Sequence, residues 1–422
     1  MTPCSGCSCC RDDDTAMPLP WDNGSVDLDD KAVHNDETVF YVVGTGPVVL
    51  TVPHGRTLRP SKIPNRTSGC MEPDTHSAQL AWAVFHHYNN KNNGQRAATD
   101  APVCSVVIGK LHRSKVDLAR PRESAAESDQ GRAAWDDYHT AIQTWLDWAI
   151  QRHGHAHLVD IHGQSHRDMT EVGHMLTNSD LRDHLSRNET TSATAANLPL
   201  LLEKSSVAAM ATLPIICDGQ INNYNWLQDV VRGPHAMGTS LDTAGYAAVP
   251  SWRIPFPCCY DCESVVQTQP PNSTQGGTSV NAPCSSDCCC HAPTTTTTKN
   301  GNDDELTTTP RNFTVTRPCT GFDVQAWRQK TCPKNTNTNG DCGFGPCSFF
   351  WGSNTLCMYG GGRIRKRDSQ PSQLPKYRGK VAATQLETAW AGARETPDQI
   401  DQFGAALAEA IHGFMKHFYG AS

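Results

Sequence analysis

The sequence predicts an α/β fold in which three layers, αβα, enclose a mainly parallel but mixed central sheet. Short apolar runs of the kind that form buried strands alternate with longer segments whose apolar residues recur at helical spacing. Such strand–helix–strand order is typical of a parallel sheet with helices on both faces. Three apolar runs also end at a histidine or a glutamate, as expected where parallel strands open into a ligand site.

The first strands are expected at residues 38–43 and 47–52. The glycine-containing connection 44–46 is typical of a hairpin, so we expect these two strands to pair with each other. The second strand runs into Pro53-His54-Gly55, which places an imidazole directly after an apolar run.

Helical and apolar segments then alternate up to residue 149. A helix is expected to begin near Asp74, and its apolar stripe holds Leu80, Val84 and Tyr88. An apolar strand is expected at residues 103–109, and residues 213–217 are a further short strand candidate. The clearest helical spacing in the chain belongs to Trp135, Tyr138, Ile142, Trp145 and Ala149.

The next strand, within residues 157–166, changes abruptly from apolar to polar at its end. Asp160 and His162 are two residues apart, so they share one face of the strand. A carboxylate beside an imidazole fixes its tautomer and frees the other ring nitrogen for a metal. Gly163 then permits a sharp turn. A purely structural Asp–His pair at a strand end is the alternative interpretation.

Regular structure returns after residue 348. Residues 381–386 predict a strand that ends at Glu387. The closing helix begins with a capping box, Thr396 to Gln399, with proline at its first position. Its buried stripe is expected to hold Ile400, Phe403, Leu407, Ile411, Phe414 and Phe418.

Composition narrows the class of protein. The chain has 422 residues and a net charge of −7, which gives no reason to expect nucleic acid or an anionic membrane as a partner. No apolar run has the length of a transmembrane helix, and no basic region followed by an apolar core marks a secretory signal. We therefore expect a cytoplasmic protein that binds neither nucleic acid nor membranes.

The 19 cysteines are unevenly distributed and suggest three parts. Residues 1–36 form a polar, cysteine-containing tail that we expect to be disordered. Residues 258–347 form a long irregular insertion rich in cysteine and threonine. The remaining residues, 37–257 and 348–422, are expected to form a single domain. A structural zinc site among the cysteines of the insertion remains an alternative.

The polar strand ends suggest metal chemistry. Two imidazoles and one carboxylate are enough protein ligands for a catalytic zinc that keeps one position open. His54 and His162 supply the imidazoles, and a second carboxylate must act as base to the attacking water. Glu72, Asp74 and Glu387 are the available acids, and spacing does not decide among them.

Several motifs follow one another in a characteristic order. They are Val52-Pro53-His54-Gly55, Asp74-x-x-Ser77-x-x-Leu80, Arg113-x-x-Val116-Asp117-Leu118-x-Arg120, Asp160-Ile161-His162-Gly163-Gln164-x-His166, Gly173-His174, the Val-Pro-Ser that ends 245–251, Phe349-Phe350-Trp351-Gly352 and Gln385-Leu386-Glu387. Each motif alone is weak, but the ordered set resembles the N-formylglutamate amidohydrolase family across roughly residues 38–255 and 349–419.

The resemblance implies a zinc-dependent amide hydrolase with the carboxypeptidase-like phosphorylase/hydrolase fold. His54, Asp74 and His162 would be the metal ligands, and Glu387 would be the general base. Asp160 would contact His162 from the side away from the metal. Asp74 also has an ordinary structural role open to it, as a helix N-cap. Glu72 is the other acid that could bind the metal.

The resemblance also implies the substrate, a small N-acyl acidic amino acid such as N-formylglutamate. Its carboxylates would meet Arg113 and Arg120, because a guanidinium presents a fork that matches a carboxylate. Pairing of these arginines with Asp117 is the structural alternative. His139 and His166 are further candidates for substrate contacts.

Two departures from the family pattern leave a second function open. Arg56 stands where the family usually has a small residue, and Ala119 where an asparagine is common. A catalytically silent binding or scaffold protein with the same fold, which uses the Cys-rich insertion for metal or partner contacts, is therefore the alternative hypothesis.

Overall fold

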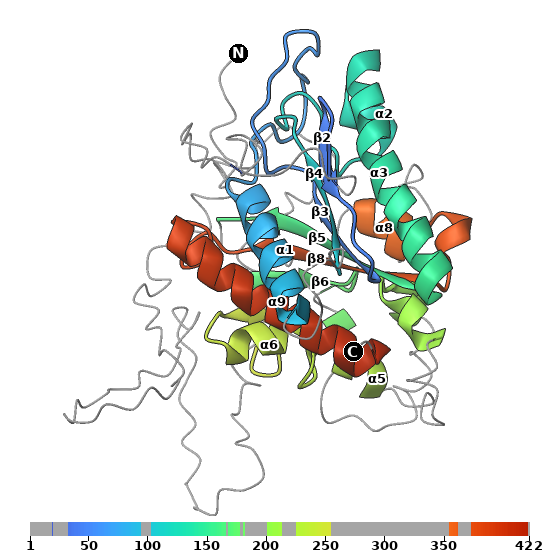
Figure 1. The fold of residues 1–422 in the computed structure, drawn as a ribbon, viewed down its shortest axis with the longest axis vertical. Coiled ribbons are helices and arrows are strands. Elements are labelled where there is room, and N and C mark those ends of the chain that lie inside the picture. The colour runs from blue at the N-terminus through green and yellow to red at the C-terminus, as the bar shows by residue number, and fades with distance from the viewer. Residues whose placement is uncertain are drawn as a thin grey trace, which may run out of the picture. The chain divides into compact units, whose positions relative to one another are not determined.

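The computed structural model describes Leu19 and residues 33–93, 103–165, 168–177, 180–181, 201–212, 225–254, 354–361 and 373–420 (Figure 1). The predicted insertion 258–347 and the short strand 213–217 lie outside the described residues. The predicted tail also lies outside them, apart from Leu19 and residues 33–36. The predicted division into domains therefore stays a prediction.

The described residues form an eight-stranded mixed sheet in the order β1-β2-β4-β3-β5-β8-β6-β7. Its strands are β1 (Val33–Asn35), β2 (Val39–Val42), β3 (Val48–Val52), β4 (Ser105–Gly109), β5 (Ala156–Gly163), β6 (Thr170–Gly173), β7 (Ala248–Val249) and β8 (Val381–Thr388). The four central strands β4, β3, β5 and β8 are parallel. Antiparallel pairing joins β1 to β2, β2 to β4 and β6 to β8, whereas β6 and β7 are parallel.

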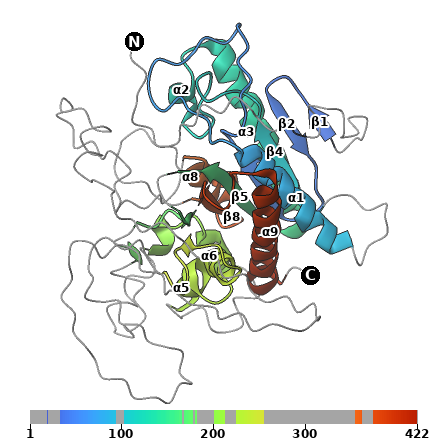
Figure 2. The same ribbon diagram turned by 90° about the vertical axis from the view of Figure 1, so that its left-hand side faces the viewer.

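Helices cover both faces of the sheet, which confirms the predicted αβα architecture. They are α1 (Ser77–Asn93), α2 (Arg122–Ala125), α3 (Asp129–His153), α5 (Asn225–Arg232), α6 (Met237–Thr243), α8 (Asn354–Gly360) and α9 (Pro397–Tyr419). Two 3₁₀ helices, η2 (Ala208–Thr212) and η3 (Pro375–Tyr377), complete the described elements. Helix α1 lies beside α9 in both views (Figures 1 and 2).

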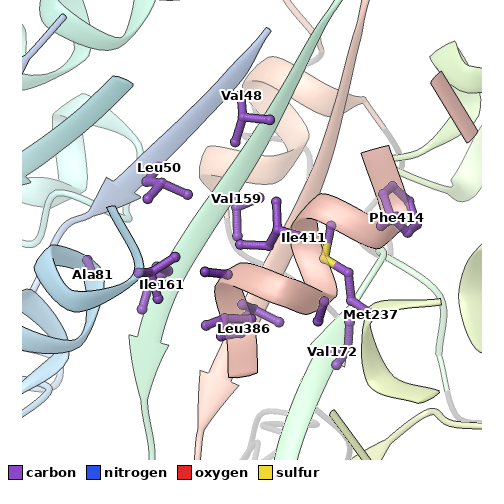
Figure 3. Packing of buried hydrophobic residues seen from close by; sticks show 14 of the residues in the cluster. Val48, Leu50, Ala81, Val159, Ile161, Val172, Met237, Leu386, Ile411 and Phe414 are labelled. Atoms are coloured by element: carbon purple, nitrogen blue, oxygen red, sulfur yellow. The ribbon is translucent and has the colours of Figure 1, made fainter. Parts of the chain in front are cut away.

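Alternate residues of the central strands supply the two hydrophobic cores. Leu50, Val159 and Leu386 pack with residues of α1, α5, α6 and α9. Figure 3 shows these side chains with Ile411 and Phe414 of α9 close by. Val49, Leu158 and Ala383, on the same three strands, point to the opposite face and pack with α2, α3 and α8. Both faces are apolar because both are covered, as is usual for parallel strands.

The predicted helices are confirmed in place and in orientation. Helix α1 buries its Leu80, Val84 and Tyr88 stripe, and α9 buries all six apolar residues predicted for it. The Thr396 hydroxyl caps α9 by accepting a hydrogen bond from the Gln399 backbone N–H at 3.3 Å. Each fully buried large apolar side chain contributes roughly 1.5–3 kcal/mol, so these stripes attach the helices to the sheet.

The predicted hairpin is wrong. Strand β4 lies between β2 and β3 and pairs with both, antiparallel to the first and parallel to the second. The 44–46 connection passes over the start of β4, where the Gly44 N–H donates to Ser105 Oγ at 2.9 Å and the Gly46 N–H to the Val103 carbonyl at 2.6 Å. A Cβ at Gly44 would collide with the backbone of Cys104. These glycines serve a close backbone crossing and not a hairpin turn.

Within the part of the chain that the structure describes, no helix has both the length and the apolar character needed to cross a membrane.

A buried histidine joins the sheet to the closing helix. His157 on β5 is fully buried, with Nδ1 2.8 Å from the Tyr419 hydroxyl of α9 and Nε2 3.0 Å from Thr384 Oγ1 of β8. Burial lowers the pKa of His157 to about 3, and repulsion from His174 and His155 acts in the same direction. The folded protein therefore holds this imidazole neutral.

This neutral imidazole predicts a loss of stability in acid. Above about pH 6.5 the ring is neutral in both states and has no effect, but below it the unfolded chain binds a proton that the folded chain does not. Between about pH 6 and 4, His157 should lower the free energy of unfolding by about 1.4 kcal/mol per pH unit. Urea unfolding at several pH values should show a correspondingly smaller slope for His157→Gln.

The matched control is Tyr419→Phe, which removes a hydrogen-bond partner of His157 but keeps the titrating ring. It should lose stability at every pH and retain the wild-type slope. Equal slopes in His157→Gln and wild type would contradict the prediction.

Candidate metal centre

Two strand ends and one loop bring together three side chains of types that bind metal ions. His54 follows β3, His162 lies near the end of β5, and Asp74 lies in the loop before α1. The Asp74 backbone N–H donates to the His54 carbonyl at 3.0 Å, which joins the loop to the strand end. One ligand atom from each of the three residues lies within 4.8 Å of the other two, and all three residues are buried.

A single carboxylate oxygen lies at the middle of this cluster. Asp74 Oδ2 is 3.4 Å from His54 Nδ1 and 3.0 Å from His162 Nδ1. The Gly163 backbone N–H also donates to it, at 3.3 Å. The two rings are inclined at 70° with centroids 5.0 Å apart, so both Nδ1 atoms face the same small volume.

Each imidazole has a second carboxylate behind it. His54 Nε2 is 2.7 Å from Asp117 Oδ1, and His162 Nε2 is 3.0 Å from Asp160 Oδ2. The Thr51 hydroxyl donates to the other oxygen of Asp160 at 2.7 Å. A carboxylate in this position keeps the proton on Nε2 and leaves the Nδ1 lone pair for a metal. The donor set of two imidazoles and one carboxylate therefore fits a zinc ion.

Asp117 is a site residue that sequence reasoning did not identify as a partner of His54. The sequence suggests it only as a partner of the flanking arginines. In the sequence it is a single acid between Val116 and Leu118. This pattern indicates a buried carboxylate but does not show which residue it contacts.

The electrostatics of the cluster favour a cation. Burial opposes charge on Asp74, but the imidazoles of His54 and His162 outweigh it and hold the pKa of that carboxyl well below its usual range. Burial also opposes charge on Asp117, whose pKa is nevertheless held low by Arg113 and His54. The pKa of His162 is raised well above its usual value because Asp160 outweighs the effect of burial.

Glu387 stands beside the cluster on the neighbouring strand. It pairs in register with His162, and its Oε1 is 4.0 Å from His162 Nδ1. The Gln385 side-chain amide donates to the same oxygen at 2.9 Å and fixes its position. Burial raises the pKa of Glu387 to about 8, with a contribution from the nearby Asp74 and Glu171 carboxylates, whereas His162 opposes the rise.

Three arginines surround Asp117. Arg113 Nε is 3.2 Å from Asp117 Oδ2, and its Nη1 is 3.5 Å from Asp74 Oδ1. Arg66 and Arg120 approach the same Asp117 oxygen to 3.7 and 3.5 Å. The side chain of Arg120 is 51 % exposed, whereas that of Arg66 is 5 % exposed and donates to three backbone carbonyls. Arg120 is thus the guanidinium of this group that solvent reaches most.

The other predicted site residues lie elsewhere or outside the described residues. His139 is buried in α3, with Nδ1 2.7 Å from the Tyr359 hydroxyl and Nε2 2.9 Å from the Leu118 carbonyl. Both ring nitrogens are therefore engaged inside the fold. His166 lies outside the described residues. Glu72 is partly buried and is not one of the three residues of the cluster.

A small pocket adjoins the cluster on the side of Asp74. Its walls come from the loops after β5 and β8 and from the loop before α1. The lining residues are Asp74, Thr75, Gly163, Gln164, Ser165, Trp390 and Arg394. Trp390 and Arg394 were not identified from the sequence, since neither belongs to a motif or to an apolar stripe.

Comparisons with known proteins add little to this geometry. No family model matches the chain, and no match was found among curated proteins. One similar crystal structure is of gene product Atu2144 from Agrobacterium tumefaciens, at 16 % identity and a TM-score of 0.25, covering 36 % of this chain and 68 % of that one. Another is of N-formylglutamate amidohydrolase from Ralstonia eutropha JMP134, at 15 % identity and a TM-score of 0.24, covering 36 % and 72 %.

The carboxylates that contact Nε2 of the two imidazoles should affect how tightly the cluster binds a metal. Asp160→Asn and Asp117→Asn each remove the charge that orients one histidine, so each should weaken Zn²⁺ binding by about 10–100-fold. Competition with a chromophoric chelator at one fixed pH measures this. Asp136→Asn is the control, because Asp136 pairs with Arg122 at the surface. Wild-type affinity in both variants would show that the cluster is not the metal site.

Proposed function

We propose that the chain is a zinc-dependent amidohydrolase that cleaves the amide bond of N-acyl acidic amino acids of the N-formylglutamate type. One observation carries the proposal. His54, Asp74 and His162 bring their ligand atoms within 4.8 Å of one another, and Glu387 stands 4.0 Å from His162 Nδ1 on the adjacent strand. The amide bond and the acidic amino acid are taken from the motif resemblance.

The residues present suit zinc. His54 and His162 would bind it through Nδ1 and Asp74 through Oδ2, and three protein ligands are the number that catalytic zinc sites use. When bound, the ion supplies Lewis acidity, which acidifies water and polarises a carbonyl group. Asp117 and Asp160 hold the two rings in the tautomer and orientation that binding needs.

Glu387 has the position of a general base. Its Oε1 faces the ligand cluster, and the Gln385 amide keeps that oxygen in place. In the proposed reaction Glu387 takes a proton from the attacking water and later passes it to the leaving amine. Since the residue is only 9 % exposed, bulk water competes little for this proton.

The arginines support an acidic substrate. Arg66, Arg113 and Arg120 all approach Asp117, so three guanidinium groups lie on this side of the cluster. Arg113 also contacts Asp74, which joins the group to the ligand cluster. We assign the substrate carboxylate to Arg120, whose exposed guanidinium has the fork that binds carboxylates.

The first test removes the base and keeps the shape of the side chain. Glu387→Gln should lower kcat for N-formylglutamate by roughly 10²–10⁴-fold and leave the zinc content unchanged, because Glu387 is not a ligand. Steady-state kinetics and metal analysis of the same preparations measure both quantities. The control is Glu123→Gln, a change at an 82 % exposed glutamate of α2.

Two results would count against the proposal. A zinc-loaded wild type that hydrolyses no N-acyl amino acid would exclude the activity. Zinc that survives the double change His54→Ala and His162→Ala would place the metal on other residues, as expected for a silent scaffold that uses its cysteines.

The second test concerns substrate charge. Arg120→Ala should raise KM for N-formylglutamate roughly 10-fold or more with little change in kcat, because a charge-assisted hydrogen bond is lost. Assays with N-formylleucine separate the two substrate carboxylates: an unchanged KM assigns Arg120 to the side-chain carboxylate, and a raised one to the α-carboxylate. Arg132→Ala, at a surface pair with Asp129, is the control. An unchanged KM for both substrates would contradict the assignment.

A further inference from the structure

We infer that Arg394 is a positioning residue that holds the segments of the metal centre in register. It lies in the loop between β8 and α9 and lines the pocket beside Asp74, where a substrate-binding arginine would also be expected. The contacts of its guanidinium decide between these two roles. The inference rests on the proposed function only where turnover is measured.

The guanidinium donates to backbone carbonyls of three separate segments. Nη1 donates to Thr75, Nη2 to Gln164 at 2.9 Å and to Thr388 at 3.1 Å, and Nε to Ala389 at 3.2 Å. The side chain is 2 % exposed, so these hydrogen bonds replace water around a buried charge. Four hydrogen bonds from one rigid group fix the spacing of the three segments.

Each of these segments carries one residue of the candidate centre. Thr75 directly follows Asp74, Gln164 comes two residues after His162, and Thr388 directly follows Glu387. A shift of the guanidinium therefore moves two of the ligands and the base together. His54 is joined to the same assembly by the hydrogen bond from the Asp74 N–H to its carbonyl.

The surroundings of Arg394 are shaped for it. A Cβ at Gly163 would collide with the guanidinium, so glycine at this strand end makes room for the side chain. The guanidinium carbon lies 5.6 Å from the centre of the Trp390 ring. His76 Nδ1 is 2.7 Å from the Arg394 carbonyl, and the His76 ring stacks on Trp390 at 5.4 Å. Two residues from Asp74, His76 thus adds a second connection between the loops.

The same contacts exclude Arg394 as the anion-binding group of the pocket. A carboxylate that approached its fork would have to displace the carbonyls of Thr75, Gln164 or Thr388. Displacing them leaves buried acceptors unsatisfied, which is unfavourable. Arg120, in contrast, is half-exposed and approaches a single carboxylate, that of Asp117.

The experiment measures metal binding in the full-length protein without substrate. Co²⁺ is the probe, because its visible absorption reports ligand geometry. Arg394→Lys keeps the positive charge, but an ammonium group lacks the planar fork that reaches three segments. We expect the Kd for Co²⁺ to rise about tenfold or more, with an altered visible spectrum and a fall in kcat that exceeds any change in KM.

A second variant acts from the other side. Gly163→Ala keeps the arginine at position 394, but the added Cβ displaces its guanidinium from the strand end. It should therefore raise the Kd for Co²⁺ and alter the visible spectrum, as Arg394→Lys does. Ser206→Ala is the matched control. It removes a buried hydrogen bond to the Ala383 carbonyl of β8, away from the Glu387 end of that strand. It should lower the urea midpoint and leave the Co²⁺ spectrum and Kd unchanged.

The outcomes separate the two roles. Wild-type Co²⁺ affinity and spectrum in both Arg394→Lys and Gly163→Ala would overturn the inference. A raised KM with unchanged metal binding would overturn it as well and make Arg394 a substrate-binding residue. A wild type that binds Co²⁺ but hydrolyses no N-acyl amino acid would remove the proposed function and leave the positioning role standing.

Discussion

The site depends on one buried oxygen atom, Asp74 Oδ2, which faces the Nδ1 atoms of both His54 and His162. Asp74, Asp117 and Asp160 are all at most 3 % exposed, so three carboxylates surround two imidazoles in a region of low dielectric constant. Charges of one sign this close together are costly unless opposite charge balances them. The arginines balance Asp117 from outside. Asp160 raises the pKa of His162, so a proton on this imidazole supplies positive charge inside the cluster, and a metal ion held by His54, Asp74 and His162 could take its place.

The topology of the sheet explains how distant residues reach this oxygen. Strands β3, β5 and β8 are parallel neighbours, so their carboxyl ends meet at one edge, where α/β proteins bind ligands. The register of β5 with β8 places Glu387 opposite His162. The loop before α1 returns over the same edge and brings Asp74 to it. His162 and Glu387 therefore stand on strands whose positions both cores fix, and His54 closely follows a third, so the positions of these side chains relative to one another are well defined.

Local sequence patterns predicted the helices and strands. Strand pairing and several side-chain contacts depend on residues far apart in the sequence, and local patterns did not predict them. Apolar runs and helical stripes gave the central strands and α1, α3 and α9, because these signals lie within one segment. The 44–46 connection was misread since β4, more than 50 residues later in the chain, inserts between the two strands that it joins. His54, His162 and Glu387 stood out at strand ends. Asp74 needed the family resemblance. Asp117 and Arg394 act across sequence separations of 63 and 230 residues, and no local pattern marks such a contact.

The same separations connect metal binding to folding. Asp74 lies 20 residues from His54 and 88 from His162, so the unfolded chain has no preformed site. A metal that binds only the folded state stabilises it by about 2.7 kcal/mol at a free concentration 100 times its Kd. Whole domains are stable by only about 5–15 kcal/mol, so this contribution is a large fraction of the total. A cation that bound His54, Asp74 and His162 would therefore stabilise the folded chain, and the proposed reaction depends on the same three residues.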